Sequence, residues 1–184
     1  MTPAGDVPGG RPVIVRRTYL GMNAPTDLRA AGIPALRLDV TEQHRCTAAE
    51  YRRLYRAVGA AWHWHDRERW SDMELAAYLA RPDVHVWVAR LGRRLAGFFE
   101  LLERDEDASV EIVYFGLVRE CMGQGLGGAL LTRAVEEAWR LGVRRVWLHT
   151  CTLDAPQALP NYLARGFTVE REETYTTTLP PDAG

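Results

Sequence analysis

Alternating apolar and polar residues predict most of the strands of this chain. A strand places successive side chains on opposite faces, so a half-buried strand alternates with a period of two. The segments with this pattern, or with an apolar run bounded by turn residues, are Arg11–Tyr19, Ala35–Val40, His85–Ala89, Leu95–Leu102, Ser109–Val118, Val143–Cys151 and Phe167–Leu179. The sequence Arg-Leu-Gly-Arg-Arg between the third and fourth segments is typical of a hairpin turn. We therefore expect seven strands, with the third and fourth as antiparallel neighbours.

Apolar residues at helical spacing predict the helices. Thr47–Glu50 and Ser71–Glu74 are capping boxes, whose side chains satisfy free backbone N–H groups at a helix start. The first box is followed by an apolar face of Tyr51, Leu54, Tyr55, Val58 and Ala61. The second box begins a short helix that ends before Pro82. We expect two further helices, one from a Gly-rich segment to Gly142 and one over Ala155–Arg165.

The order of these elements predicts the fold class. The chain runs β-β-α-α-β-β-β-α-β-α-β, so helices interrupt a series of mostly antiparallel strands. This order is typical of an α/β (α+β) fold with a mixed sheet. Since no repeat, low-complexity segment or linker divides the chain, we expect one domain over residues 13–180. Residues 1–12 carry Pro and Gly without the apolar stretch of a signal peptide, so we expect a flexible N-terminal tail there.

Charge and composition exclude several functional classes. The formal net charge is −1, so no strong field favours a nucleic acid or an anionic membrane as partner. No apolar run reaches the length of a membrane span. Cys46, Cys121 and Cys151 lack metal-ligand and redox-motif spacing, which favours free thiols in a reducing cytoplasm. The chain has no lysine, and all 23 of its Lys and Arg positions are arginine.

The strongest functional signal is the segment Gly123-Gln-Gly-Leu-Gly-Gly128, which lies between a strand and a helix. Glycines let backbone N–H groups turn toward one point, and a helix N-terminus adds positive potential there. Such a turn can bind a diphosphate without lysine, although close packing is an alternative reason for its glycines. A P-loop is excluded because it requires lysine. The dinucleotide fingerprint G-x-G-x-x-G also matches, but the next strand ends without the acidic residue that binds a ribose, so an oxidoreductase is the second choice.

Three motifs, in the expected order, resemble those of the GNAT acetyltransferase family. Gly125-Leu-Gly127 resembles the Gly-x-Gly of its acetyl-CoA motif, with Met122 where Arg or Gln is usual. Glu111–Val118 resembles the motif strand of the histone acetyltransferase branch. Tyr162–Phe167 resembles the family's Tyr-x-x-x-Gly-Phe, with Ala155 where an Asn is usual seven residues earlier. The resemblance covers about half of the chain.

The resemblance implies a GNAT fold, with helices on both faces of a mixed, mostly antiparallel central sheet. It also implies acetyl-CoA as cosubstrate and direct transfer of the acetyl group to an amine. We expect no metal, because the cysteines and the pair His63 and His65 lack metal-ligand spacing. The residues implied to bind the coenzyme are Leu117, Val118, Met122, Gly123, Gln124, Gly125, Leu126, Gly127 and Gly128. The family places a bulge at the end of the motif strand, here near Leu117 and Val118, where a free N–H can hold the acetyl oxygen.

Two residues are candidates for the proton transfers of this reaction. An amine must be neutral to attack, and the departing thiolate benefits from a proton. Glu111 lies between apolar neighbours and is the candidate base, acting directly or through water. Its alternative is a carboxylate on the solvated side of a strand. Tyr162 is the candidate acid, and its alternative is an ordinary core tyrosine.

The segment from residue 62 to residue 70 is the candidate acceptor site, because in the family's topology it lies where acceptors enter. Trp62, Trp64 and Trp70 are expected to form an aromatic wall, and Arg67 or Asp66 to set a charge preference. Packing of an amphipathic segment is the alternative. A closed aromatic pocket would favour a small-molecule amine, and an open groove would favour a protein or peptide amine.

The activity and the assembly of the chain each allow a second interpretation. The departures at Met122 and Ala155 keep open a non-catalytic domain that binds or senses acyl-CoA. The Thr- and Tyr-rich last strand could pair between two copies of the chain, which would give a homodimer.

Overall fold

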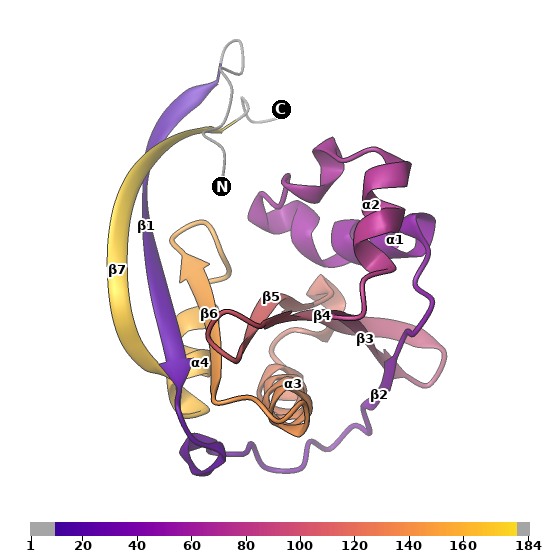
Figure 1. The fold of residues 1–184 in the computed structure, drawn as a ribbon, viewed down its shortest axis with the longest axis vertical. Helices are drawn as coiled ribbons and strands as arrows, with labels where there is room; N and C mark the ends of the chain where they lie inside the picture. Colours follow the sequence, from indigo (N-terminus) through magenta and orange to yellow (C-terminus); the bar gives the residue numbers. More distant parts are fainter. Residues whose placement is uncertain (1–9, 180–184) are drawn as a thin grey trace.

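Seven strands form one mixed sheet in the order β2-β3-β4-β5-β6-β1-β7 in the computed structural model, which describes residues 10–179 (Figure 1). The strands are β1 (Arg11–Met22), β2 (Asp39–Glu42), β3 (Val84–Leu91), β4 (Arg94–Arg104), β5 (Ser109–Leu117), β6 (Arg145–Cys151) and β7 (Thr168–Leu179). Neighbouring strands are antiparallel except β5 and β6, which are parallel. The predicted α/β fold with a mixed, mostly antiparallel sheet is confirmed.

Residues 10–179 also contain four α-helices and four short 3-10 turns. The helices are α1 (Ala48–Gly59), α2 (Asp72–Leu79), α3 (Leu126–Arg140) and α4 (Ala158–Ala164), and the 3-10 turns are η1 (Pro25–Asp27), η2 (Ala60–Trp62), η3 (Arg67–Arg69) and η4 (Arg119–Cys121). Both predicted capping boxes are present, because the Thr47 and Ser71 hydroxyls each accept a backbone N–H at 3.2 Å. None of these helices is both long enough and apolar enough to cross a membrane.

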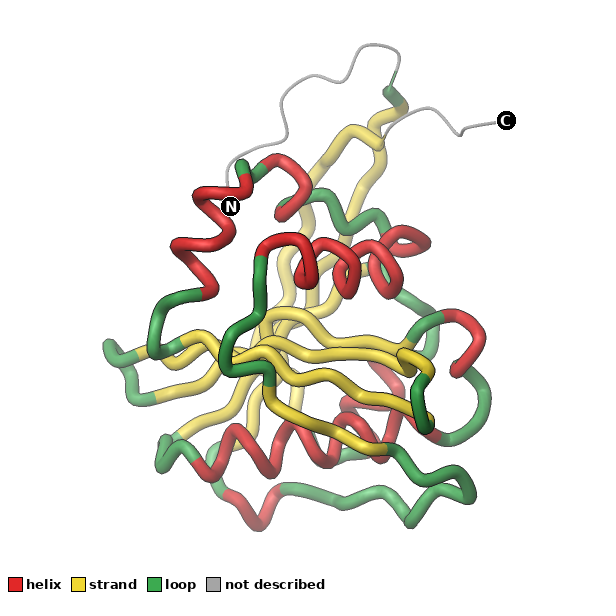
Figure 2. The backbone as a smooth tube through the Cα atoms, turned by 90° about the vertical axis from the view of Figure 1, so that its right-hand side faces the viewer, coloured by secondary structure: helices red, strands yellow, loops and turns green. Residues whose placement is uncertain are grey.

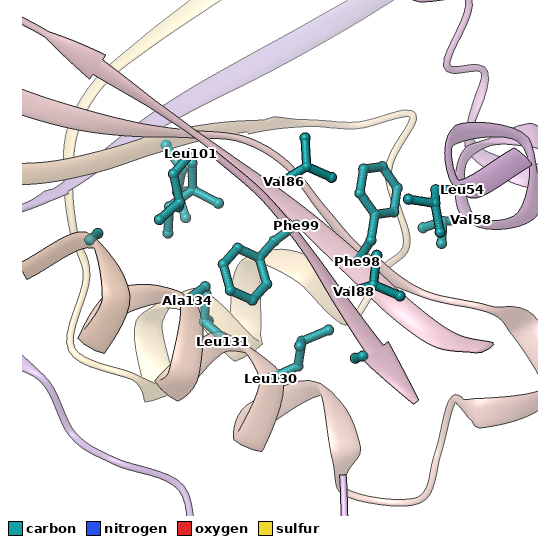
Figure 3. Packing of buried hydrophobic residues seen from close by; sticks show 14 of the residues in the cluster. Leu54, Val58, Val86, Val88, Phe98, Phe99, Leu101, Leu130, Leu131 and Ala134 are labelled. Carbon is teal, nitrogen blue, oxygen red and sulfur yellow. The ribbon is translucent and has the colours of Figure 1, made fainter. Parts of the chain in front are cut away.

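Helices cover both faces of the sheet (Figures 1 and 2). The pair α1 and α2 lies on one face, and α3 and α4 lie on the other. Two adjacent residues of β4 show how one strand supplies both layers, since successive side chains of a strand point in opposite directions. Phe98 points toward Leu54 and Val58 of α1, whereas Phe99 points toward Leu131 of α3 (Figure 3). Both phenyl rings are completely buried, so the core has an apolar layer on each side of the sheet.

The N-terminal strand lies between the two most C-terminal strands of the sheet. Arg17 of β1 is opposite Cys151 of β6 on one side and Glu173 of β7 on the other. Past the end of β6, β1 and β7 continue as a pair to Arg11 and Leu179. They form a curved two-stranded arm that faces α1 and α2 across the molecule (Figure 1). Alternation predicted both strands of the arm, but not their pairing.

Several predicted boundaries differ from the structure by a few residues, and two of them change the description of the fold. The expected strand Ala35–Val40 lies too early, because β2 begins at Asp39, where it pairs with Arg90 of β3. In this register β3 ends at Leu91, opposite residue 38, so residues 35–37 lie past the end of β3. The expected tail at residues 1–12 overlaps β1 at its last two positions, and residues 1–9 lie outside the described part of the chain.

Candidate active site

The site is organised around the point where β5 and β6 separate. These strands pair only through Ser109–Arg145, Val110–Val146 and Glu111–Trp147, although β5 continues to Leu117 and β6 to Cys151. The wedge beyond Glu111 and Trp147 opens into a cleft of about 1730 Å³. The other walls of the cleft come from the segment between α1 and α2, the Gly-rich turn, α4 and the β1–β7 arm. The cleft therefore brings together motifs that are far apart in the sequence.

A β-bulge lies in the wedge, at Val113. Ile112 is opposite Leu101 and Tyr114 is opposite Glu100, so Val113 is the extra residue of β5. The predicted position of the bulge, near Leu117 and Val118, is wrong. At that end of β5 the pairing with β4 is regular, because glycines let the two backbones approach closely: a Cβ at Gly97 would lie 2.3 Å from the carbonyl oxygen of Gly116.

Glu111 lies at the base of the wedge and lines the cleft. Its residue is only 5% exposed, which excludes the alternative of a carboxylate on a solvated face. Arg104 of β4 donates a hydrogen bond to Glu111 Oε2, and His149 Nε2 of β6 lies 4.0 Å from Glu111 Oε1. The carboxylate is therefore held between a cation and an imidazole, neither of which was predicted to belong to the site.

The glycines of the Gly-rich turn have different surroundings. Gly123 and Gly125 have left-handed backbones, with φ of +73° and +74°, and a Cβ at either position would meet no other atom. Gly125 is the N-cap residue of α3, so the first N–H groups of this helix point out of the turn. A Cβ at Gly128 would instead lie 2.9 Å from the side chain of Arg165, the C-cap residue of α4. Gly123 and Gly125 therefore leave an open surface at a helix N-terminus, whereas Gly128 packs closely against the end of α4.

The residues implied to bind the coenzyme divide into those that line the cleft and those that do not. Those that line the cleft are Leu117, Met122, Gly123, Gly125, Gly127 and Gly128. Val118 and Leu126 belong to the apolar core, and Leu126 is completely buried. Gln124 is exposed outside the cleft and donates through its side-chain amide to the Glu120 carbonyl at 2.7 Å. A role for these three residues would therefore have to come from their backbone.

Tyr162 belongs to α4, which covers the face of the sheet opposite α1 and α2 (Figure 1). Its ring contacts Phe115 of β5 and Phe167 at centroid distances of 6.0 and 6.2 Å. The residue is buried yet lines the cleft, and its hydroxyl has no hydrogen-bond partner among the described residues. Burial, together with the negative charge of Asp154, raises the pKa of Tyr162, so the phenol keeps its proton at neutral pH.

All four predicted acceptor residues line the cleft, but three of them also have structural partners. The Trp64 ring packs against Tyr114 at a centroid distance of 4.9 Å. The Arg67 guanidinium lies over the Trp70 ring, 4.1 Å from its centroid. Trp62 is half-buried at the end of a 3-10 turn. The aromatic wall therefore exists, and amphipathic packing holds most of it in place.

A buried carboxylate outside the predicted site residues supports this wall. Glu100 of β4 is completely buried and accepts hydrogen bonds from the Tyr51 and Tyr78 hydroxyls, the latter at 2.6 Å. It also forms an ion pair with Arg67 at 3.3 Å. Burial acts to lower the pKa of Arg67, but the charge of Glu100 and the nearby hydroxyls of Tyr114, Tyr51 and Tyr78 together outweigh it and raise the pKa, so the arginine stays charged. The one available signal was a charged residue inside an apolar strand.

The arm supplies a polar wall that no motif marks. Arg17 of β1 donates to Glu173 Oε1 at 3.1 Å and to the Tyr175 hydroxyl at 3.0 Å. The Tyr19 hydroxyl donates to the same Glu173 oxygen at 2.8 Å. All four side chains line the cleft. Only the long-range pairing of β1 with β7 brings these residues together.

The described residues contain no group of His, Cys, Asp and Glu side chains that could hold a metal ion. The backbone of His63 is left-handed, with φ of +56°, at the end of η2. The rings of His63 and His65 lie 6.2 Å apart at the edge of the cleft.

Comparisons with known proteins relate this geometry to a family. The model of the acetyltransferase (GNAT) family matches residues 34–167, which include the wedge, the Gly-rich turn and α4 but neither strand of the arm. No curated protein matches the chain. A GCN5-related N-acetyltransferase from Sphaerobacter thermophilus is 20% identical, with a TM-score of 0.64, over 94% of this chain and 54% of that chain. Another from Kribbella flavida is 19% identical, with a TM-score of 0.61, over 94% of this chain and 61% of that chain.

A third solved structure is an aminoglycoside acetyltransferase from an uncultured soil metagenomic sample, in complex with trehalose. It is 19% identical, with a TM-score of 0.57, over 70% of this chain and 86% of that chain. The chain spans less than two thirds of the length of the first two relatives, and identities this low show a shared fold. The family model covers most of the sequence, and its match includes the motifs that meet in the cleft. The chain therefore belongs to the GNAT acetyltransferase family.

Proposed function

We propose that this protein transfers an acetyl group from acetyl-CoA directly to an amine of a small molecule. The observation that carries the proposal is the meeting of two features in one cleft: the open glycine turn at the N-terminus of α3, and the wedge between β5 and β6 with Glu111 at its base. The glycine turn suits a diphosphate, and the wedge suits the long, thin chain of the coenzyme that carries the acyl group.

The residues present fit the coenzyme. Gly123 and Gly125 leave room for phosphate oxygens, and the free N–H groups at the start of α3 supply donors and positive potential without lysine. Strands β5 and β6 do not pair with each other past Glu111, so their backbone groups there are available to hydrogen-bond the acyl-bearing chain of the coenzyme. When bound, the coenzyme supplies an activated acyl group. Met122, although unusual for the family, lines the cleft and leaves the backbone donors unchanged.

Direct transfer agrees with the chemistry of the side chains around the wedge. Glu111 and its neighbours form the side of the site that takes a proton from the amine, and Tyr162, which keeps its proton, is the donor for the departing thiolate. Cys151 also lines the cleft, but burial raises the pKa of its thiol. A protonated thiol is a poor nucleophile, so an acyl-cysteine intermediate is disfavoured.

The walls of the cleft suit a polar amine with apolar surface. Trp62, Trp64 and Trp70 form one side, and the charged network around Arg17 and Glu173 forms the other. Because one structural relative is an aminoglycoside acetyltransferase, aminoglycosides belong in the first set of acceptors to be tested.

A peptide amine is the second candidate, and the size of the cleft favours it. Its volume of about 1730 Å³ exceeds the range of about 300–1,000 Å³ that is usual for small-molecule pockets. Part of this space is required by the coenzyme, and residues of the β1–β7 arm also line it.

Release of the coenzyme thiol from acetyl-CoA, measured with a panel of aminoglycosides, polyamines, aromatic amines and peptides, tests the function. Transfer to at least one small amine is expected, together with acetyl-CoA binding in calorimetry. Preference for peptides would support the second candidate. Binding without any thiol release would indicate an acyl-CoA sensor, and preference for NAD(H) over acetyl-CoA would indicate an oxidoreductase. We infer that the protein works in the reducing cytoplasm, because its three cysteines are unpaired.

A further inference from the structure

His149 lies at the mouth of the wedge, beside the glutamate that the sequence motif singled out. It follows Trp147 by two residues on β6, and Trp147 pairs with Glu111, so all three side chains leave the same face of the sheet. The ring of His149 meets the ring of Tyr19 edge to face, at a centroid distance of 5.7 Å. Its side chain is 35% exposed and lines the cleft. The imidazole can therefore be reached by a molecule in the cleft.

Glu111 is less available than this imidazole. Its residue is 5% exposed, and it already accepts a hydrogen bond from Arg104. Because one carboxylate oxygen is engaged by this cation and the side chain is almost completely buried, little of Glu111 is left to face an amine. A neutral imidazole is the better acceptor near pH 7, where histidine ordinarily titrates.

We propose that His149 takes the proton from the acceptor amine, with Glu111 and Arg104 as positioning residues behind it. This inference rests on the proposed acetyl transfer. His149 accepts the proton that the amine nitrogen loses as that nitrogen bonds to the acyl carbon. Tyr162 donates a proton to the sulfur whose bond to this carbon breaks, so the products are the amide and the free thiol. Solvent then returns the proton from His149 to Tyr162.

The charges around His149 fit this role. Desolvation by the walls of the cleft and the charge of Arg17 on β1 lower the pKa of His149, which keeps the ring neutral and able to accept a proton. Glu111 on β5, Asp154 after β6 and Asp66 between α1 and α2 act in the opposite direction and stabilise the imidazolium once it forms. From β7, Glu173 accepts hydrogen bonds from Arg17 and from Tyr19, whose ring contacts His149.

An NMR titration tests this arrangement without an acceptor. The Cε1–Hε1 signal of His149, assigned by its loss in His149→Gln, is expected to titrate below about 6.5, the ordinary value for histidine. In Glu111→Gln the midpoint should fall further, because a negative charge 4.0 Å from Nε2 is removed. A midpoint above the ordinary value, or one that Glu111→Gln leaves unchanged, would overturn the proposed pairing.

Kinetics then test the proton transfer. With acetyl-CoA and the best amine of the panel, His149→Gln should lower kcat by about 100-fold or more and remove the acid limb of the pH–rate profile. Glu111→Gln should move that limb to lower pH, and Glu111→Asp should restore it in part. Acetyl-CoA affinity in calorimetry should stay within about twofold of the wild-type value. His44→Gln, at an exposed histidine outside the cleft, serves as the control and should behave as wild type.

Different results would refute the proposed acetyl transfer and the proposed role of His149. If wild-type protein binds acetyl-CoA and acetylates an amine while His149→Gln keeps the wild-type rate and acid limb, the role of His149 is refuted and the function stands. If no amine of the panel is acetylated, the transferase function is refuted, and the role of His149 with it.

Discussion

Gly125 and Gly142, at the two ends of α3, have nearly the same left-handed backbone, with φ of +74° and +77°. A Cβ would meet no other atom at either position. They differ in their surroundings, because Gly125 lines the cleft at the N-terminus of the helix and Gly142 lies outside it, past the C-terminus. The chain thus contains a matched pair of sites for testing where the coenzyme binds.

Gly125→Asp is expected to weaken acetyl-CoA binding by at least about tenfold, because a carboxylate would face the diphosphate. Gly142→Asp has the same backbone cost, about 1–2 kcal/mol for a side chain in the left-handed region, and should bind acetyl-CoA as wild type does. Calorimetric titration of both variants makes the comparison, with thermal unfolding as the check on folding. Equal affinities for the two variants would refute the glycine turn as the diphosphate site.

Arg67 and Glu100 provide a prediction about stability. Arg67→Met would leave a completely buried carboxylate with only its two tyrosine partners. Removing one partner of a buried ion pair costs about 3–5 kcal/mol, so the free energy of unfolding should fall by about this amount. Urea denaturation measures it, and Arg69→Met, at an exposed arginine two residues away, is the control. A fall in the free energy of unfolding of less than about 1 kcal/mol would mean that the ion pair contributes little to stability and that Arg67 is available to contact the substrate.

Local patterns predicted the elements of this fold, and long-range pairing decided their arrangement. The capping boxes at Thr47 and Ser71 and the glycine turn are set by residues close in sequence, so they were predictable. The position of β1 between β6 and β7 depends on partners about 130 to 170 residues away, and no local pattern specifies it. The bulge at Val113 was misplaced for the same reason, since it depends on how β5 fits between two neighbouring strands.

The residues of the candidate site show the same contrast between local patterns and long-range pairing. Motifs led to Glu111, Tyr162 and the glycines, because each lies in a short segment with a recognisable spacing. His149, Arg104 and the network of Arg17 have no motif and join the site only when the sheet forms. The arm also lies outside the part of the chain that the family model matches. The acceptor wall is therefore the part of the site that family resemblance informs least.

Tyr162→Phe tests the proton donor with little change in packing. The ring would keep its contacts with Phe115 and Phe167, and the hydroxyl that is removed has no hydrogen-bond partner among the described residues. Stability should therefore change by less than about 1 kcal/mol, while kcat should fall by about 100-fold. Thermal unfolding and thiol-release rates, measured on the same preparation, separate the two effects. A wild-type rate would assign Tyr162 to the core alone.

His85 predicts a pH dependence of stability away from the cleft. Its Nδ1 lies 2.9 Å from Glu42 of β2, and its Nε2 lies 2.9 Å from Glu103 of β4, so one imidazole bridges three strands. Partial burial acts to lower the pKa of His85, but the hydrogen bonds to Glu103 and Glu42 and their charges outweigh it, and the net pKa is raised. The charged ring is therefore stabilised in the folded state and not in the unfolded chain.

The direction of the pH dependence of stability follows from the raised pKa of His85 in the folded protein. Below the ordinary histidine pKa of about 6.5 the ring is charged in both states, and the stabilisation is fully present. As the pH rises through the raised pKa of the folded protein, the charge and its stabilisation are lost. His85→Gln should therefore lower the free energy of unfolding by about 1–3 kcal/mol at pH 6 and by less at pH 9, as measured by urea denaturation at both values. The control is His44→Gln, which removes an exposed partner of the same Glu42 and should change stability little at either pH. A deficit in His85→Gln that is equal at pH 6 and pH 9 would mean that the bridge works as neutral hydrogen bonds and not through the charge of the ring.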